Sequence, residues 1–410
     1  MLLWQKGTVV GLSDRLEQFR NPGRNGSDTR ATKQPEDWRP RMDIDTAKGG
    51  FVVGTPRPEG EEVDALTVLQ EFGLNPAEWT VTSMRRGKWQ RYDGEWLESV
   101  RVNVVPAVAS MSDLVDMEQL VDHIKKWRPS KGTVKSTGEG AFLVAPSDQQ
   151  IGKKANGQGT GQSVDRILSL TEKAVRRFEQ NKKAGINPGT IAMALLGDHV
   201  EGTTSQNGRL QGQAASDLGI TEQTRVARRL LLAQVKAFAP LVNRLVVPVI
   251  NGNHDEATRQ VVTDPADGWT VEIASAVQDI CAENPELAHV EFRYPSTGHQ
   301  TLTIDIEGTM LGMFHGHQAN QNGIMKFLSQ HAAGQTALGG ADLWISGHFH
   351  NFKTMDIGER LWVQAPTTDP GSEWFRDRAG VESKPGLLTM MIGGSYEPRE
   401  HISVLAVDNE

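Results

Sequence analysis

The sequence has little cysteine, no long apolar run near its start and no excess of basic charge, and each absence argues against a class of protein. Cys281 is the single cysteine among 410 residues. No disulfide can therefore form within the chain, which suits a reducing compartment. The formal net charge is −8, from 51 acidic and 43 basic residues. This balance argues against a uniformly basic surface, so any contact with nucleic acid would use a local patch.

The start of the sequence also lacks the pattern of a targeting or membrane segment. The stretch MLLWQKGTVVG reaches a lysine at its sixth position and contains no long hydrophobic run, so we expect neither a signal peptide nor a membrane anchor. Hydrophobic residues make up 38% of the chain, which over this length is enough for two domains with cores of their own. We therefore expect a soluble, cytoplasmic protein with no membrane partner.

The first part of the chain divides into two segments by composition. Residues 1–50 are rich in Pro, Gly, Asn and charge, and we expect a flexible arm or linker there. Residues 51–130 contain a helix-like stretch (63–74), two alternating stretches joined by a Gly-containing turn (79–106) and an amphipathic helix (111–127). This pattern predicts a small α+β module that ends where Pro, Ser and Gly mark a boundary.

From residue 140 to 410, short apolar stretches alternate with helical ones, which predicts an α/β domain with buried strands. Two amphipathic stretches, 163–180 and 221–239, lie between the first three apolar stretches. Later strands come with fewer helices, which favours a mixed or two-sheet arrangement over a simple doubly wound sheet. The apolar stretches begin at residues 142, 191, 245, 310 and 343, and later strands are expected at 301–306, 361–364 and 387–392.

Four of these apolar stretches end in side chains that bind metals. Because the carboxyl ends of neighbouring strands meet at one crevice, the four segments are expected to converge, and their glycines allow sharp turns. A mixture of carboxylate, amide oxygen and imidazole suits a divalent ion such as Mn²⁺, Fe²⁺ or Zn²⁺. The residues are Asp198 in GDHVEG, Asn253, His254 and Asp255 in GNHD, His315 and His317 in FHGH, and His348 and His350 in GHFH.

Each segment alone has another interpretation. An isolated His-x-His is more often a surface or hydrogen-bonded pair, and Asn and Asp in a Gly-Asn-His-Asp turn can cap the next helix. Six of the eleven histidines fall within the four segments, and helix capping does not explain why imidazoles recur at the ends of strands. The four segments together therefore predict a metal centre.

In their order along the chain, the segments resemble those of the calcineurin-like metallophosphoesterases. That family has Asp-x-His, Gly-Asp-x-x-Asp, Gly-Asn-His-Asp or Glu, a lone His, and Gly-His-x-His. The matching segments here begin at Asp148, Gly197, Gly252, His315 and Gly347. The opening Ser-Asp-Gln-Gln-Ile-Gly-Lys is also similar to that of bacteriophage members, for which the location would be the host cytoplasm. The resemblance covers residues 140–400 and implies an α/β fold, a four-layer α-β-β-α sandwich preceded by the small module.

The resemblance further implies a phosphoester hydrolase with two divalent metal ions. Mn²⁺ is the expected ion, and Fe²⁺ and Zn²⁺ are the alternatives. Two ions that share a water lower its pKa and direct the resulting hydroxide in line at phosphorus. The catalytic residues would be His254, which contacts the phosphate or protonates the leaving oxygen, and Asp255, which fixes the orientation of His254. The first ion would be held by Asp148, Gln150, Asp198 and His350, and the second by Asp198, Asn253, His315 and His348.

Gln150 departs from the family pattern, which has histidine at that position. None of the eleven histidines has an Asp two residues before it, so a displaced Asp-x-His does not exist elsewhere in the chain. A neutral amide oxygen is a weaker donor than imidazole, so we expect the first site to bind less tightly or to prefer a harder ion such as Mn²⁺. Glu201 stands where the family often has Asp, and we expect it to support its loop.

The sequence leaves three functions open. A nuclease similar to the double-strand-break-repair branch of the family is favoured by basic and aromatic clusters at 85–92, 125–128 and 374–378. The first cluster fits equally well a hairpin whose aromatic side chains pack in the small module with solvated charges around them. A phosphatase or phosphodiesterase for nucleotides or cyclic nucleotides fits the acidic net charge, and a non-catalytic metal-binding scaffold is the third. The small module is expected to recognise substrate, bind a protein partner or form a homodimer. Further candidates for substrate binding are His317, Lys154 and Arg376.

Overall fold

The chain separates into two compact units, Met1–Asp113 and Leu114–Glu410, and each is described by itself. Arg376 and most of the predicted arm lie outside the described residues. The computed structural model describes residues 40–45, 49–58, 63–91, 94–106, 115–130, 132, 135–203, 216–258, 263–371 and 384–407.

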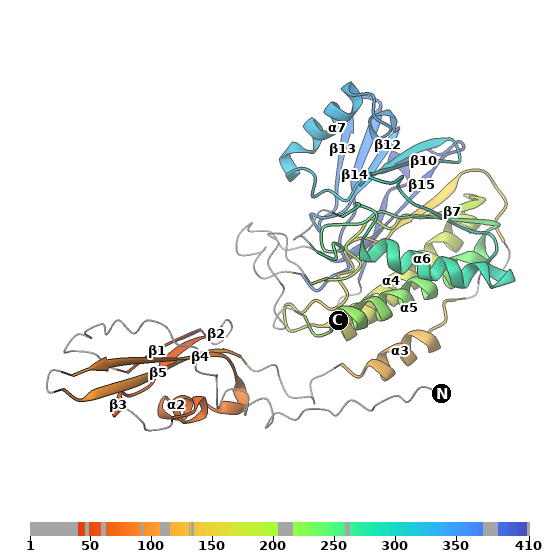
Figure 1. Ribbon diagram of the computed structural model, residues 1–410. Helices are drawn as coiled ribbons and strands as arrows, with labels where there is room; N and C mark the ends of the chain where they lie inside the picture. The colour runs from red at the N-terminus through yellow and green to blue at the C-terminus, as the bar shows by residue number, and fades with distance from the viewer. Residues whose placement is uncertain are drawn as a thin grey trace, which may run out of the picture. The chain divides into compact units, whose positions relative to one another are not determined.

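The first unit is a small α+β module, drawn in red and orange in Figure 1. Its helix α2 (Ala65–Glu71) is capped by Asp64, whose side chain accepts a hydrogen bond from the backbone N of Thr67. The long strands β4 (Trp79–Gln90) and β5 (Trp96–Pro106) pair antiparallel. An apolar cluster joins the helix to the sheet and contains Val52, Val68, Leu69, Val102 and Val104.

Part of the predicted arm belongs to this sheet. Strand β1 (Arg41–Asp45) pairs antiparallel with β2 (Gly49–Val53), and β2 pairs with β5. The short strand β3 (Arg57–Pro58) lies on the other side of β5. Ile44 packs against the apolar cluster of the module, so its burial stabilises the strand. The expectation of an arm as far as residue 50 is therefore wrong at its C-terminal end.

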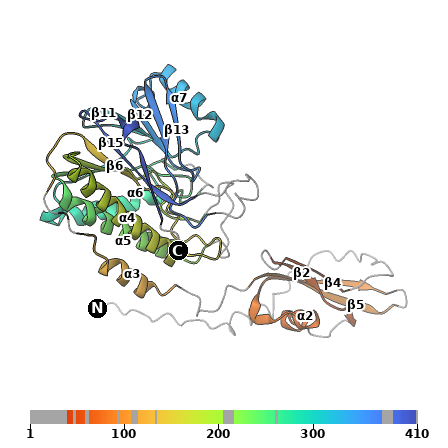
Figure 2. The ribbon, with the colours of Figure 1, turned by 180° about the vertical axis from the view of Figure 1, so that it is seen from behind.

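The second unit contains two sheets with helices on their outer faces (Figures 1 and 2). Its helices are α3 (Met117–Lys126), α4 (Thr160–Lys183), α5 (Ile220–Phe238), α6 (Trp269–Ala282) and α7 (Ile324–Ala333). Its strands are β6 (Ala141–Ala145), β7 (Thr190–Met193), β8 (Arg244–Pro248), β9 (Val290–Arg293), β10 (Leu302–Ile306), β11 (Thr309–Met313), β12 (Leu343–Ser346), β13 (Lys353–Ile357), β14 (Arg360–Gln364), β15 (Gly386–Ile392) and β16 (Ser403–Ala406). One sheet has the order β16-β15-β6-β7-β8-β9, and the other has the order β10-β11-β12-β14-β13.

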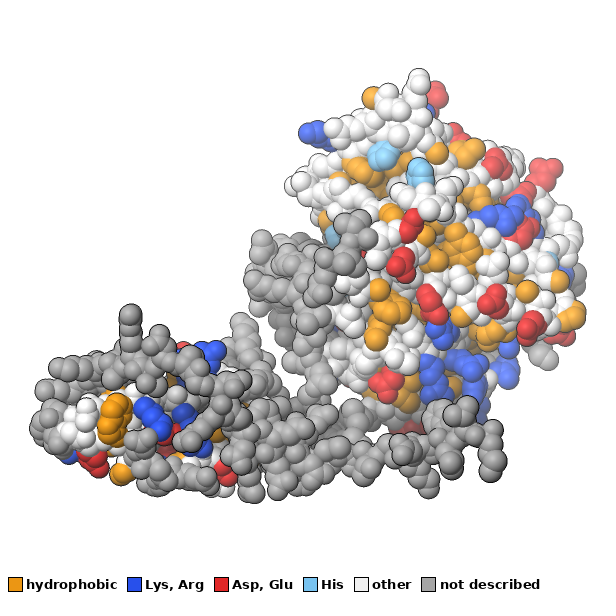
Figure 3. All heavy atoms as spheres, in the orientation of Figure 1, with side chains coloured by type: hydrophobic (Ala, Val, Ile, Leu, Met, Phe, Trp, Pro, Cys, Tyr) orange, Lys and Arg blue, Asp and Glu red, His pale blue; other side chains and the backbone are white. Residues whose placement is uncertain are grey.

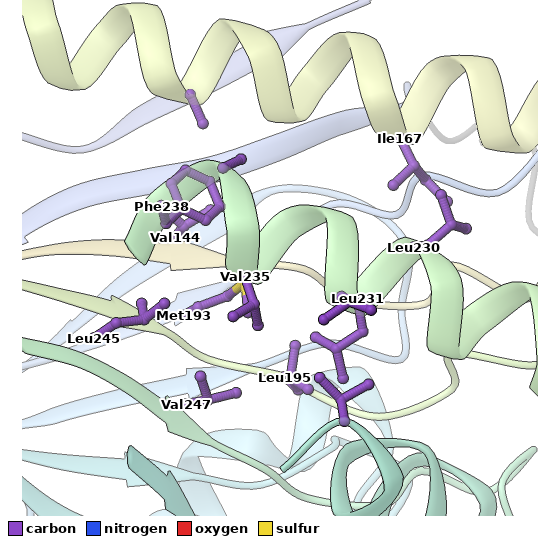
Figure 4. Close-up of a cluster of buried hydrophobic side chains, with 14 of the residues drawn as sticks. Val144, Ile167, Met193, Leu195, Leu230, Leu231, Val235, Phe238, Leu245 and Val247 are labelled. Carbon is purple, nitrogen blue, oxygen red and sulfur yellow. The ribbon is translucent and has the colours of Figure 1, made fainter. Parts of the chain in front are cut away.

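The alternation of side chains along the strands builds three apolar layers. Phe142 of β6 packs among the helices, whereas its neighbour Leu143 faces the second sheet. In the second sheet, Ile345 faces the first sheet and Trp344 packs beneath α7. The layers therefore run helix, sheet, sheet, helix, and the predicted four-layer α-β-β-α sandwich is confirmed. Figure 4 shows the first of these layers, where Phe238 of α5 lies over the strands.

Each long helix packs in the core through one apolar face. The buried positions of α4 are spaced by three or four residues, which is the period of a helix that covers a sheet. The predicted helices at 163–180 and 221–239 correspond to α4 and α5, whose ends lie within three residues of the predicted ones. Among the helices that the structure describes, none combines the length and the apolar character needed to cross a bilayer. The buried face of α4 includes Val164, Ile167, Thr171, Ala174 and Phe178.

Helix α3 belongs to the second unit, although the sequence placed it in the small module. Leu120 and Ile124 are buried in the core formed by the helices and the first sheet. His123 lies 2.8 Å from Asp165 of α4 through its Nε2 atom. The apolar face of α3 thus finds its partners in the second unit, and the boundary lies between residues 113 and 114 rather than near 130.

Candidate metal centre

The predicted ligands come from loops that follow parallel strands in both sheets. Strands β6, β7 and β8 are parallel in one sheet, and β11, β12 and β14 are parallel in the other. Their carboxyl ends therefore lie at one end of the sandwich, where the loops meet. Two backbone hydrogen bonds join the first two loops, from Asp148 N to Gly197 O (3.1 Å) and from Gln150 N to Asp198 O (2.9 Å).

The backbone at these loops is strained. Eight described residues other than glycine have a positive φ, a region that such residues rarely adopt and that costs about 1–3 kcal/mol each. Five of the eight are predicted ligands, so the strain is concentrated where the side chains must be aimed. The five are Asp148 (48°), Gln150 (41°), Asp198 (54°), His348 (69°) and His350 (61°).

Asp198, His315 and His348 form the tightest group of candidate ligands, each with one ligand atom within 4.8 Å of the others. His315 Nε2 lies 2.9 Å from Asp198 Oδ2, and apart from this contact neither buried atom has a hydrogen-bond partner. Two atoms that bind the same ion at about 2.1 Å are themselves roughly 3 Å apart. The spacing of this pair therefore fits one divalent ion.

A contact behind the candidate ligands selects the tautomer of His315 that would be able to bind a metal. Its Nδ1 lies 2.7 Å from the carbonyl oxygen of Leu196, to which it donates, so Nε2 is the atom that faces Asp198. Burial alone would lower the pKa of His315, but the carboxylate of Asp198 raises it to about 9. Asp198 thus attracts positive charge to this position, whether a proton or a metal ion.

The loop after β8 closes against Asp198. The backbone N of His254 donates to Asp198 Oδ1 over 2.7 Å, which leaves Oδ2 for an ion. Asn253, the amide ligand expected from the sequence, is buried in this loop with 3% of its surface exposed. The loop brings Asn253 and His254 to the carboxylate that the resemblance assigns as the bridge.

Glu201, rather than Asp255, orients the ring of His254. Nδ1 of His254 lies 2.9 Å from the Glu201 carbonyl oxygen and 3.7 Å from its carboxylate. Asp255 Oδ2 instead accepts the backbone N–H groups of Asp198 and Gly252, each at 2.7 Å. Burial raises the pKa of Asp255 to about 7, and the charge of Asp198 adds to the rise. Asp255 therefore braces two ligand loops, a role different from the expected one.

The other half of the centre contains Asp148 and His350. Asp148 Oδ1 is buried without a hydrogen-bond partner and lies 3.3 Å from His350 Nε2. It also lies 3.9 Å from His315 Nε2, so Asp148 is adjacent to both halves. His350 Nδ1 lies 3.1 Å from Asp369 Oδ2, and Asp369 is fully buried. This pairing directs Nε2 of His350 towards Asp148.

Asp369 is a buried acidic residue of this cluster that sequence reasoning missed. It follows the predicted strand at 361–364 by five residues, behind Ala-Pro-Thr-Thr. The available signal was an acidic side chain after an apolar strand, the same signal that identified Asp148 and Asp198. No histidine accompanies Asp369 in the sequence, and its glycine, Gly371, follows it instead of preceding it, so it matched none of the motifs.

Gln150 is buried but its amide oxygen already has a partner. Lys153 Nζ donates to Gln150 Oε1 over 2.6 Å, and the same ammonium pairs with Asp369.

Of the residues expected to bind substrate, His317 lies at the centre, with the centroid of its ring 5.5 Å from that of His315. Lys154 is exposed, and Arg376 lies outside the described residues.

Gly252→Ala tests how closely the loops fit. A Cβ at this position would lie 2.1 Å from Asp198 Oδ1 and 2.7 Å from His315 Cε1, so these two side chains must move. We expect a loss of about 10² in kcat/KM, the effect of a shift of about 1 Å at a site, together with weaker metal binding in isothermal titration. Gly161→Ala is the matched control, because its Cβ would meet nothing within 4 Å. Equal activity in both variants would contradict the assignment.

Comparisons with known proteins give only distant similarity. No family model matches the sequence, and no curated protein matches it. An archaeal phosphodiesterase has 12% identity and a TM-score of 0.30 over 65% of this chain and 99% of its own. Vps29 from Entamoeba histolytica, solved with zinc, has 14% identity and a TM-score of 0.29 over 62% of this chain and 87% of its own. A predicted phosphoesterase from Streptococcus pneumoniae has 11% identity and a TM-score of 0.27 over 66% and 100%.

Proposed function

We propose that the chain is a metal-dependent phosphoester hydrolase, and that its substrate is a phosphodiester of nucleic acid. The observation that carries the proposal is the buried pair of Asp198 Oδ2 and His315 Nε2, 2.9 Å apart beside His348. A bound divalent ion would neutralise charge on the phosphoryl oxygens and activate water for attack. The motifs around this pair resemble, in their order, those of the calcineurin-like metallophosphoesterases. This resemblance supports phosphoester hydrolysis as the type of reaction.

Besides the residues that would hold the ion, His254 is the residue that can take part in the reaction. About 11% of this side chain is exposed, so the ring can reach a bound phosphate. Its Nδ1 donates to the Glu201 carbonyl oxygen at 2.9 Å, and the other nitrogen, Nε2, is left to face the substrate. Protonated on both nitrogens, a ring held in this way can give the Nε2 proton to the leaving oxygen and return to the neutral form.

Exposed cations in the first unit support a nucleic-acid substrate. Arg85, Arg86 and Lys88 are exposed on β4. Arg85 can contact a phosphate backbone, whereas Arg86 and Lys88 pair with Glu98 at 3.2 and 3.6 Å and would have to give up that carboxylate to do so. Trp89 of the same strand is 7% exposed, so it packs in the module rather than offering a free face for base stacking. In the view of Figure 3, the Lys and Arg side chains of the second unit are most numerous in its lower part, and others lie apart from these at its right and upper left.

A hollow beside the centre favours a nucleotide as the second candidate substrate. It has a volume of about 270 Å³ and reaches Gly252 and His317. Its described lining includes Glu256, Asp264 and Asp267 but no Lys or Arg, so it suits the hydrogen-bond donors of a base or sugar better than further phosphates.

A substrate panel tests the proposal. The protein with Mn²⁺ is incubated with single-stranded DNA, duplex DNA, a cyclic nucleotide, bis-p-nitrophenyl phosphate and p-nitrophenyl phosphate, with and without chelator. We expect release of nucleotides from DNA and hydrolysis of the synthetic diester, both abolished by the chelator. Hydrolysis of the cyclic nucleotide without cleavage of DNA would favour the second candidate. Turnover of the monoester alone would contradict both. Inactivity with Mn²⁺, Zn²⁺ and Fe²⁺ would indicate a non-catalytic scaffold.

A further inference from the structure

A lysine lies within the half of the centre that the resemblance assigns to a first metal ion. The side chain of Lys153 is 12% exposed, and its ammonium pairs with Asp369, whose carboxylate is fully buried. Nζ also donates to Gln150 Oε1 over 2.6 Å. The amide oxygen expected to replace a histidine ligand is therefore already bonded to a cation.

The neighbouring charges hold this ammonium in place. Asp369 Oδ2 also lies 3.1 Å from His350 Nδ1, and His350 Nε2 lies 3.3 Å from Asp148 Oδ1. Basic and acidic groups thus alternate from Lys153 to Asp148. The ammonium of Lys153 thus lies between the carboxylate of Asp369 and the amide oxygen of Gln150, two acceptors that favour its charged form.

A divalent ion on Gln150 Oε1 would place two cations on one oxygen atom. The amide oxygen has no net charge with which to offset their repulsion, and the repulsion is strong where water is excluded. Lys153 and a first ion therefore compete for the same position. Asp198, His315 and His348 lie on the other side of Asp148, and in the described part of the chain no lysine or arginine pairs with these three side chains. A proton on His315 can leave when an ion binds, whereas the ammonium of Lys153 is held by Asp369.

We propose that the centre binds one divalent ion rather than two, and that the ammonium of Lys153 supplies the positive charge that a first ion would carry. Asp198, Asn253, His315 and His348 would hold the single ion. This inference rests on the metal centre of the proposed function. Counting bound ions tests it independently of which phosphoester is hydrolysed.

The experiment counts manganese in the full chain. The protein is stripped with a chelator, equilibrated with Mn²⁺ and freed of excess ion, and metal per chain is measured by elemental analysis and by electron paramagnetic resonance. We expect one Mn²⁺ per chain and no signal from a spin-coupled pair. The double variant Lys153→Met with Gln150→His is expected to bind two coupled ions, because the competing cation is gone and an imidazole is restored. Lys154→Met, at the exposed neighbouring lysine, is the matched control and should still bind one.

Each outcome separates the inference from the proposed function. Two ions with a coupled signal in the unchanged chain would overturn the inference and leave the proposed function standing. A complete lack of bound ions would overturn the metal centre, and both with it. A double variant that is folded by circular dichroism but still binds one ion would overturn the role of Lys153. If the double variant does not fold, the count in the unchanged chain still decides the number of ions.

Discussion

Asp198→Asn is expected to abolish stable metal binding and to lower kcat/KM by about 10³-fold or more, since a bound metal stabilises a phosphoryl transition state by several kcal/mol. The two oxygen atoms of the Asp198 carboxylate make different contacts. Oδ1 accepts the backbone N–H of His254 over 2.7 Å, and Oδ2 faces His315 Nε2 at 2.9 Å. In the variant, the amide oxygen takes the first contact, so the NH₂ group points to the position of the ion and cannot bind it.

The measurement combines metal content, turnover of bis-p-nitrophenyl phosphate and thermal unfolding. Asp165→Asn is the matched control, because Asp165 undergoes the same chemical change on α4, where its side chain is 68% exposed and pairs with His123. The control should keep both metal and activity. Full metal content in Asp198→Asn, with normal turnover, would mean that Asp198 is not a ligand.

Much of the fold and of the ligand set could be predicted because both depend on local patterns. The strand before Asp198 and the helix at 163–180 each show their own period in the sequence, and the structure has them as β7 and α4. The motifs with His315 and His348 follow strands directly, so their meeting follows from the parallel order of the sheet.

The contacts that the sequence could not reveal join residues that are far apart. Asp369 pairs with Lys153, which lies 216 residues away in the sequence, and no local pattern predicts that pairing.

The exchange of roles between Glu201 and Asp255 has a different cause. Both are acidic residues near His254, and only the turn of each backbone decides which one lies beside the ring. Strand β1 was missed because a single apolar residue, Ile44, holds it to its core.

His254→Gln is expected to keep its metal and lose catalysis, by about 10²–10⁴ in kcat, the usual contribution of a general acid. The ring is not among the atoms grouped around Asp198 and His315, so metal content should stay at the value of the unchanged chain. His123→Gln is the matched control, since the side chain of His123 is 52% exposed on α3. Loss of metal in His254→Gln would contradict this assignment and make His254 a ligand.

The size of the loss should depend on the leaving group. The p-nitrophenolate released from bis-p-nitrophenyl phosphate is stable without a proton, whereas the alkoxide released from DNA requires one. If His254 is the acid, the variant loses far more activity on DNA than on the synthetic diester. Equal losses on the two substrates would instead mean that His254 contacts the phosphate, where it stabilises charge that both reactions develop. Because Glu201 fixes the ring by a carbonyl contact of 2.9 Å, Nε2 is aimed in either case, and the ratio of the two losses identifies what it touches.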